Sequence, residues 1–226
     1  MKKLRTLLVT FANDIGYTPI SAFRGAVIEK VGRENPLFHN HLSDDTFIYK
    51  YPLIQYKKIG KQAGIFCLDE GVDEIHKLFG HRNWTIDLQG HPITLKVDRL
   101  DMKTTNVNVW EKTFDYNLWN WQALNEENWK RYLELDSMVD KVGMLEKILT
   151  ANILSFAKGI DWHIEHPIKL VIKDVKLERD SRMKDIKVRT FEVDFRCNVF
   201  LPDFMGLGKG VSKGFGTVRH FRKYEI

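Results

Sequence analysis

The sequence predicts an α+β protein made of two tandem domains, each built on an antiparallel sheet. Extended segments and amphipathic helical segments alternate in a similar order in the two halves. The length of 226 residues fits one large domain or two domains of about 100 residues each. With 43% hydrophobic and 29% charged residues the chain has a globular composition, and its two cysteines are too few for a disulfide framework or a metal cluster.

The first half shows the order β-α-β-β-α-β. Alternating apolar runs predict strands at residues 3–11, 49–58, 61–68, 84–88 and 92–100. One helix is expected over residues 20–31, with Thr18 as N-cap, Pro19 in the first turn and Gly32 as the stop. A shorter helix is expected over residues 72–79. This order is that of a ferredoxin-like, or RRM-like, domain, which we place at residues 1–103.

The second half repeats the pattern as a second ferredoxin-like domain at residues 104–226. Strands are predicted at residues 106–114, 170–175, 186–199 and 217–224. Asn125 is the expected cap of a short helix, and a longer helix follows. Its apolar stripe consists of Val142, Leu145, Leu149, Ile153 and Phe156. The apolar phase of the third strand changes near Thr190, which indicates a β-bulge.

Charge and hydropathy narrow the class of partner. The N-terminal apolar run is interrupted by Arg5 and Thr6, so it reads as a strand and not as a signal peptide. Since no apolar run approaches the ~20 residues of a membrane-spanning helix, we expect a cytoplasmic protein without a membrane partner. Residues 173–226 hold 13 Lys and Arg against 8 Asp and Glu, which equals the net charge of +5 of the whole chain. This local excess favours a polyanion as partner, and a solvated basic face is the alternative.

A glycine-rich stretch, GLGKGVSKGFG at residues 206–216, lies close to the C-terminus. Successive backbone N–H groups in such a loop form a nest for an anion, usually a phosphate. A P-loop does not fit, because Lys209 is followed by Gly210 and not by Ser or Thr. A dinucleotide-binding turn does not fit either, because no crossover helix and second strand can follow it. A flexible surface hairpin is the alternative interpretation.

The paired glycines carry a resemblance to a known family. Gly206-Leu207-Gly208, five residues, then Gly214-Phe215-Gly216 resembles the C-terminal glycine-rich motif of the CRISPR-associated RAMP proteins. With Phe23-Arg24-Gly25 in the first helix and the segment YPLIQY at residues 51–56, the chain is similar to the Cas-six family of endoribonucleases. The resemblance implies two ferredoxin-like domains and cleavage of CRISPR repeat RNA without metal or cofactor, giving guide RNAs for antiviral defence. It also implies that the loop binds RNA through Gly206, Gly208, Lys209, Gly210, Ser212, Lys213, Gly214 and Gly216, with Phe215 favoured as a core residue.

His39 and His41 are the candidate proton-transfer residues. They lie two residues apart in a segment that looks too irregular for regular structure, and if this segment is extended both rings face one side. Histidine suits both a base and an acid role, and the resemblance implies an active-site histidine after the first helix. Exposed loop histidines are the alternative. A zinc site is disfavoured because no other His or Cys lies nearby in the sequence.

Lys50 is the third candidate catalytic residue, with Tyr49 and Tyr51 beside it. The resemblance implies that a lysine or tyrosine supports the histidine, and a lysine suits the negative charge of a pentavalent phosphate. The alternative is an ordinary strand residue.

Two other functions stay open at this stage. One is a RAMP subunit that binds guide RNA within a larger CRISPR complex without cutting it. The other is a regulator that binds a free nucleotide in the glycine-rich loop. Whether the protein forms a homodimer or contacts other subunits of a CRISPR effector complex is also left open by the sequence.

Overall fold

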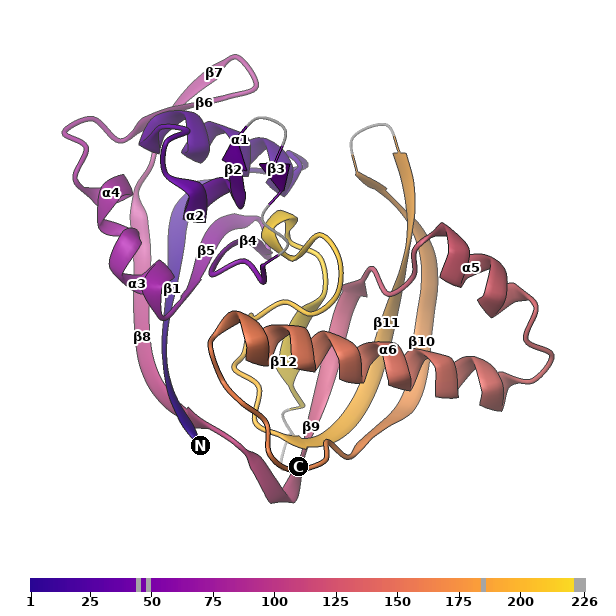
Figure 1. The fold of residues 1–226 in the computed structure, drawn as a ribbon. Helices are drawn as coiled ribbons and strands as arrows, with labels where there is room; N and C mark the ends of the chain where they lie inside the picture. The colour runs from indigo at the N-terminus through magenta and orange to yellow at the C-terminus, as the bar shows by residue number, and fades with distance from the viewer. Residues whose placement is uncertain (44–45, 48–49, 184–185, 222–226) are drawn as a thin grey trace, which may run out of the picture. The chain divides into compact units, whose positions relative to one another are not determined.

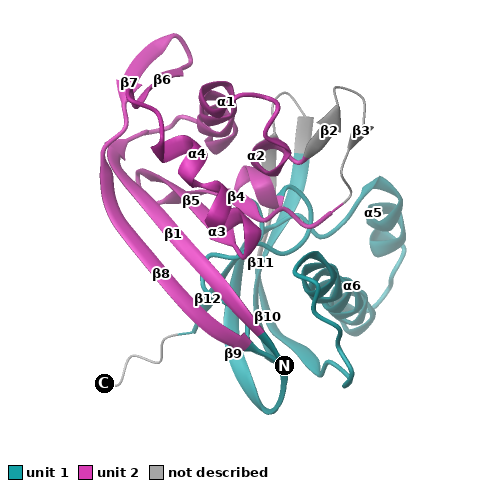
Figure 2. Cartoon of the chain, turned by 60° about the vertical axis from the view of Figure 1, so that its left-hand side comes forward, with its two compact units in different colours: residues 1–2, 107–210, 215–226 teal, residues 3–106, 211–214 magenta. Residues whose placement is uncertain are grey.

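The computed structural model describes residues 1–43, 46–47, 50–183 and 186–221, without the side chains of 41–43, 46–47, 177–183 and 186–187. The chain divides into two compact units, shown separately coloured in Figure 2. The N-terminal unit consists of residues 3–106 and 211–214, and the C-terminal unit of residues 1–2, 107–210 and 215–226. Among the described residues, no helix is both long and apolar enough to cross a membrane.

The N-terminal unit is a four-stranded sheet with the order β4-β5-β1-β8 (Figure 1). Its strands are β1 (Lys2–Asp14), β4 (Ile54–Ile59), β5 (Gln62–Leu68) and β8 (Val97–Val107). The helices are α1 (Ile20–Val31), α2 (Pro36–His39), α3 (Glu70–Glu74) and α4 (His76–Phe79). Two small hairpins are added, β2 (His41–Ser43) with β3 (Thr46–Phe47) and β6 (Thr85–Leu88) with β7 (His91–Thr94).

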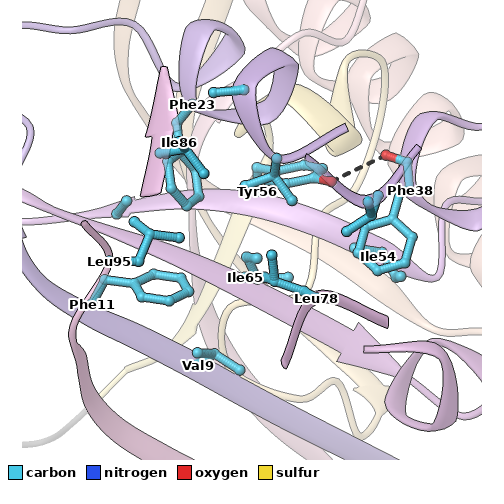
Figure 3. Close-up of a cluster of buried hydrophobic side chains, with 14 of the residues drawn as sticks. Val9, Phe11, Phe23, Phe38, Ile54, Tyr56, Ile65, Leu78, Ile86 and Leu95 are labelled. Atoms are coloured by element: carbon cyan, nitrogen blue, oxygen red, sulfur yellow. Dashed lines mark hydrogen bonds between the residues drawn. The ribbon is translucent and has the colours of Figure 1, made fainter. Parts of the chain in front are cut away.

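The core of this unit lies between α1 and one face of the sheet. Phe23 of α1 packs edge-on against Phe11 of β1 at 5.7 Å and against Tyr56 of β4 at 6.1 Å between ring centroids (Figure 3). All three side chains are fully buried. Burial of one such ring contributes about 1.5–3 kcal/mol, so this cluster fixes α1 on the sheet.

The C-terminal unit has the same neighbour order, β10-β11-β9-β12. Its strands are β9 (Val109–Trp121), β10 (Leu170–Met183), β11 (Ile186–Val199) and β12 (Thr217–His220). Between β9 and β10 lie α5 (Glu126–Leu133), which Asn125 caps as predicted, and α6 (Met138–Gly159). Four residues of the predicted stripe of α6 are buried: Leu145, Leu149, Ile153 and Phe156. The predicted α+β fold of two ferredoxin-like sheets is therefore confirmed.

Between β11 and β12 this unit lacks the second helix of a complete ferredoxin-like pattern. The connection is the glycine-rich loop, whose one helical piece is the 3₁₀ turn η1 (Val211–Lys213). The phase change predicted near Thr190 is present, since Thr190 and Phe191 are both buried. The extra residue is on β9, where Phe191 pairs with Trp121 but Val193 pairs with Leu118.

Several details of the sequence prediction are wrong, and one of them is the single helix expected over residues 72–79, which is divided into α3 and α4. Thr18 is not the N-cap of α1, because Pro19 holds that position and no side chain caps the helix. The strand expected from residue 49 begins only at Ile54, since Gln55 donates its side-chain amide to the Pro52 carbonyl and closes a turn there. The run at 92–100 is divided between β7 and β8.

Candidate functional site

The segment that carries the two histidines is a helical turn followed by a short strand, not an irregular stretch. Pro36 occupies the first turn of α2, where its missing N–H costs nothing. Asn40 ends α2 in the left-handed conformation (φ 60°, ψ 36°) and donates its N–H to the Pro36 carbonyl at 2.7 Å. The segment is therefore not locally extended, because Asn40 turns the chain between His39 and His41.

His39 is half-buried at the end of α2, and its ring is oriented by a backbone group. The Nε2 atom lies 2.6 Å from the carbonyl oxygen of Arg33. A carbonyl oxygen only accepts hydrogen bonds, so Nε2 carries the proton and donates it. In the neutral ring the lone pair is consequently on Nδ1, the atom that can accept a proton.

Two side chains from other elements hold the last carbonyl groups of α2. Arg24 of α1 donates Nη2–H to the His39 carbonyl at 2.6 Å. Tyr56 of β4 donates its hydroxyl to the Phe38 carbonyl at 3.2 Å, the bond drawn in Figure 3. Burial lowers the pKa of the Arg24 guanidinium and strongly raises the pKa of the Tyr56 phenol. Because its pKa is raised, the Tyr56 phenol stays protonated at neutral pH and donates this hydrogen bond.

Asn40 connects the histidine segment to the third candidate residue. Its side-chain amide donates to the carbonyl of Lys50 at 3.1 Å, and Lys50 itself is exposed. Lys50 is thus joined to Asn40, the residue between His39 and His41. The side chain of His41 and the whole of Tyr49 lie outside the described residues, whereas Tyr51 is buried and accepts a hydrogen bond from Gln55.

The glycine-rich loop uses several of its N–H groups to close on its own unit. Lys209 donates its N–H to the Gln122 carbonyl at 3.1 Å, and Gly216 donates to Asn120 at 2.9 Å. The described hydrogen bonds include no acceptor for the N–H groups of Gly208 and Gly210, on either side of the exposed Lys209. The loop therefore does not offer an unbroken row of N–H groups to an anion, because the N–H of Lys209 is engaged by Gln122.

Glycine is required at two positions of this loop by close packing. A Cβ on Gly216, at φ +62°, would lie 1.8 Å from the Leu207 carbonyl oxygen. A Cβ on Gly208, at φ +93°, would lie 2.6 Å from Nε1 of Trp121. Phe215 is buried as predicted. Gly216 thus lets its backbone approach that of Leu207 closely, and Gly208 leaves room for the Trp121 ring.

The predicted RNA-binding residues are divided between the two units. Ser212, Lys213 and Gly214 belong to the N-terminal unit, where η1 packs against α1 and β4. A Cβ on Gly214 would lie 2.8 Å from Ile20 of α1. The others belong to the C-terminal unit: Gly206, Gly208, Lys209, Gly210 and Gly216. Within the N-terminal unit, the tip of the loop therefore contacts the same two elements that carry Arg24 and Tyr56.

Among the described residues, no group of three or more His, Cys, Asp and Glu side chains is arranged to hold a metal ion. The Cys67 and Cys197 thiols are both buried, and burial raises the pKa of each.

Two tandem ferredoxin-like units with a glycine-rich loop before the last strand define a protein of the RAMP type. The models of the Cas6b N-terminal and C-terminal domains match residues 2–106 and 108–221. The chain therefore belongs to the Cas6b family.

Known relatives resemble both the fold and part of the sequence. A crystal structure of a Cas6b is 26% identical with a TM-score of 0.85, over 97% of this chain and 100% of that one. A structure described as the CRISPR RNA processing endoribonuclease Cas6b is 24% identical with a TM-score of 0.75 over the same shares, and it shows the fold. An uncharacterised protein of Methanocaldococcus jannaschii is 40% identical over 98 residues, 43% of this chain and 65% of that protein, just under two thirds of its length.

Sequence reasoning did not assign roles to Arg24, Asn40 or Tyr56. Arg24 and Tyr56 belong to the segments FRG and YPLIQY, which carried the resemblance without a stated function. Their positions in the sequence, 15 residues before His39 and 18 after Phe38, give no sign of contact with α2. For Asn40 the sequence carries one signal of the turn, because asparagine tolerates the left-handed conformation.

Proposed function

We propose that this protein is an endoribonuclease that cuts CRISPR repeat RNA without a metal ion, through proton transfer by His39 and His41. The observation that carries the proposal is the fixed turn after α1, in which the His39 ring is oriented by the Arg33 carbonyl. Membership of the Cas6b family supports the substrate class. A similar solved structure bears the description CRISPR RNA processing endoribonuclease.

The proposed reaction uses the 2′-OH of the RNA as nucleophile. A base removes the 2′-OH proton while O2′ bonds to the adjacent phosphorus, the bond from phosphorus to O5′ breaks, and an acid protonates O5′. The products are a 2′,3′-cyclic phosphate and a 5′-OH. We assign the base role to His39, because its Nδ1 carries the lone pair and the Arg33 carbonyl stabilises the imidazolium that forms. We assign the acid role to His41, and Lys50 is proposed to stabilise the phosphorane.

The glycine-rich loop is proposed to hold phosphates of the RNA. The N–H groups of Gly208 and Gly210 flank Lys209, which is exposed, and Lys213 adds a second charge in the same connection. Phosphate contacts of this kind position an RNA without reading its sequence.

Cleavage of cognate repeat RNA is expected to proceed in excess EDTA, because the nucleophile belongs to the substrate and the proton carriers are side chains. The measurement is gel analysis of 5′-labelled RNA incubated with purified protein, with treatment of the product by acid to open a cyclic phosphate. A strict requirement for a divalent ion would contradict the proposed chemistry. Binding without any cleavage would favour the alternative, a RAMP subunit that only holds guide RNA.

Lys209→Ala combined with Lys213→Ala is expected to weaken RNA binding and to reduce its salt dependence. Each lost phosphate contact should flatten the slope of log K against log salt by about 0.7 for single-stranded RNA. The measurement is a binding titration at four salt concentrations. Lys147→Ala, which removes an exposed charge from α6, is the control. An unchanged slope in the double variant would mean that the loop lies away from the RNA.

A further inference from the structure

Arg24 is a partly buried cation without a carboxylate partner among the described residues. Its Nε atom is buried, and no described group accepts a hydrogen bond from it. Charged groups taken out of water are usually paired, because the lost hydration is costly. The Arg24 guanidinium therefore contributes little to the stability of the fold. Its role must come from the group that it contacts.

That group is the backbone of a candidate catalytic residue. The Nη2 atom of Arg24 lies 2.6 Å from the His39 carbonyl oxygen, a length typical of a charge-assisted hydrogen bond. The preceding carbonyl, of Phe38, accepts the Tyr56 hydroxyl at 3.2 Å. Consecutive carbonyl groups at the end of α2 are thus held by one residue of α1 and one of β4.

Both side chains are placed by the core. Phe23, next to Arg24 in α1, packs against the Tyr56 ring, and both rings are fully buried (Figure 3). Burial limits the rotamers available to Tyr56, and α1 cannot turn without moving Phe23. The end of α2 is therefore held from a rigid part of the N-terminal unit.

We propose that Arg24 is a positioning residue, which together with Tyr56 fixes the His39 backbone so that the ring keeps its Nε2–H on the Arg33 carbonyl. The inference rests on the proposed function of His39 for its effect on cleavage. The effect on the ring itself is independent of any activity. A direct contact of Arg24 with RNA phosphate is disfavoured, because Nε is buried and Nη2 is engaged by His39.

The first test is made on the RNA-free protein. Long-range ¹H–¹⁵N NMR of histidine rings distinguishes the Nε2–H tautomer from the Nδ1–H tautomer, and the His39 signal is identified by its loss in His39→Ala. The wild type is expected to show the Nε2–H tautomer, and Arg24→Met a mixture of the two. Arg5→Met, which breaks an exposed ion pair with Asp73 in the same unit, should leave the wild-type pattern.

The second test separates catalysis from binding. Arg24→Met is expected to slow single-turnover cleavage by about 10- to 100-fold, the scale of a misplacement near 1 Å, with the RNA Kd unchanged within about twofold. Arg24→Lys keeps the positive charge and the ability to donate a hydrogen bond, and it should restore part of the rate. Tyr56→Phe removes only one hydroxyl and serves if Arg24→Met does not fold; it should also slow cleavage without affecting Kd.

The outcomes distinguish this inference from the proposed function. If the wild type cleaves RNA but neither the tautomer nor the rate changes in Arg24→Met, the positioning role is wrong and the proposed function stands. If Arg24→Met instead weakens RNA binding and flattens its salt dependence, Arg24 is a phosphate ligand. If the tautomer changes but the wild type does not cleave, the structural role is right and the proposed function is wrong.

Discussion

His39→Ala is expected to slow single-turnover cleavage of repeat RNA by about 10²–10⁴-fold, the usual contribution of one general base or acid. The loss arises because the variant removes the proposed base, whose ring is oriented by the Arg33 carbonyl. The RNA Kd should move little, since a neutral ring adds little to phosphate binding. The measurement is a rapid-mixing time course with protein in excess over labelled RNA.

His41→Ala should produce a loss of the same order, and the double variant should be slower than either single variant. The two effects are expected to combine to less than their product, because residues that act as a unit are not additive. His163→Ala and His166→Ala remove exposed histidines from the C-terminal unit and serve as controls. Wild-type rates in both His39→Ala and His41→Ala would place the active site elsewhere in the protein.

Gly216→Ala is expected to destabilise the C-terminal unit more than any other change considered for this loop. The new Cβ would overlap the Leu207 carbonyl oxygen, with only 1.8 Å between them, and the residue would keep a positive φ. Together these effects should lower the free energy of unfolding by about 2–5 kcal/mol. For a protein of this size that corresponds to a loss of about 4–20 °C in Tm, measured by calorimetry.

Gly60→Ala is the matched control for this prediction. Gly60 has nearly the same backbone conformation, φ +60° against +62°, but nothing lies within 4 Å of its would-be Cβ. Only the conformational cost remains there, about 1–2 kcal/mol. Equal losses of stability in the two variants would show that close approach to Leu207 has no part in the requirement for glycine at position 216.

The fold was predictable from local patterns because both units follow them closely. The stripe of α6, the cap at Asn125 and the strand at 186–199 depend on residues near one another in the sequence. The start of β4 was not predictable in the same way. An apolar run such as YPLIQY satisfies the pattern of a strand, while the side-chain hydrogen bond of Gln55 to Pro52 makes part of it a turn.

The candidate site was predictable as a set of residue types but not as an arrangement. Histidine chemistry and the spacing of two residues indicated His39 and His41, while the conformation between them depends on Asn40. The contacts of Arg24 and Tyr56 with α2 join segments that meet only after the sheet has formed. The glycines of the loop suggested a ligand, and at Gly208 and Gly216 the immediate requirement is close packing within the protein.

A substrate with a single 2′-deoxy nucleotide at the cleavage position tests the central claim most directly. The 2′-OH of that nucleotide is the proposed nucleophile, so the substitution should abolish cleavage while the RNA Kd stays within about twofold of the all-ribose value, since one hydroxyl adds little to a binding surface dominated by phosphate contacts. The measurement compares both substrates with wild-type protein in EDTA. Cleavage of the 2′-deoxy substrate at the all-ribose rate would mean that water or another group attacks the phosphorus, and would contradict the account.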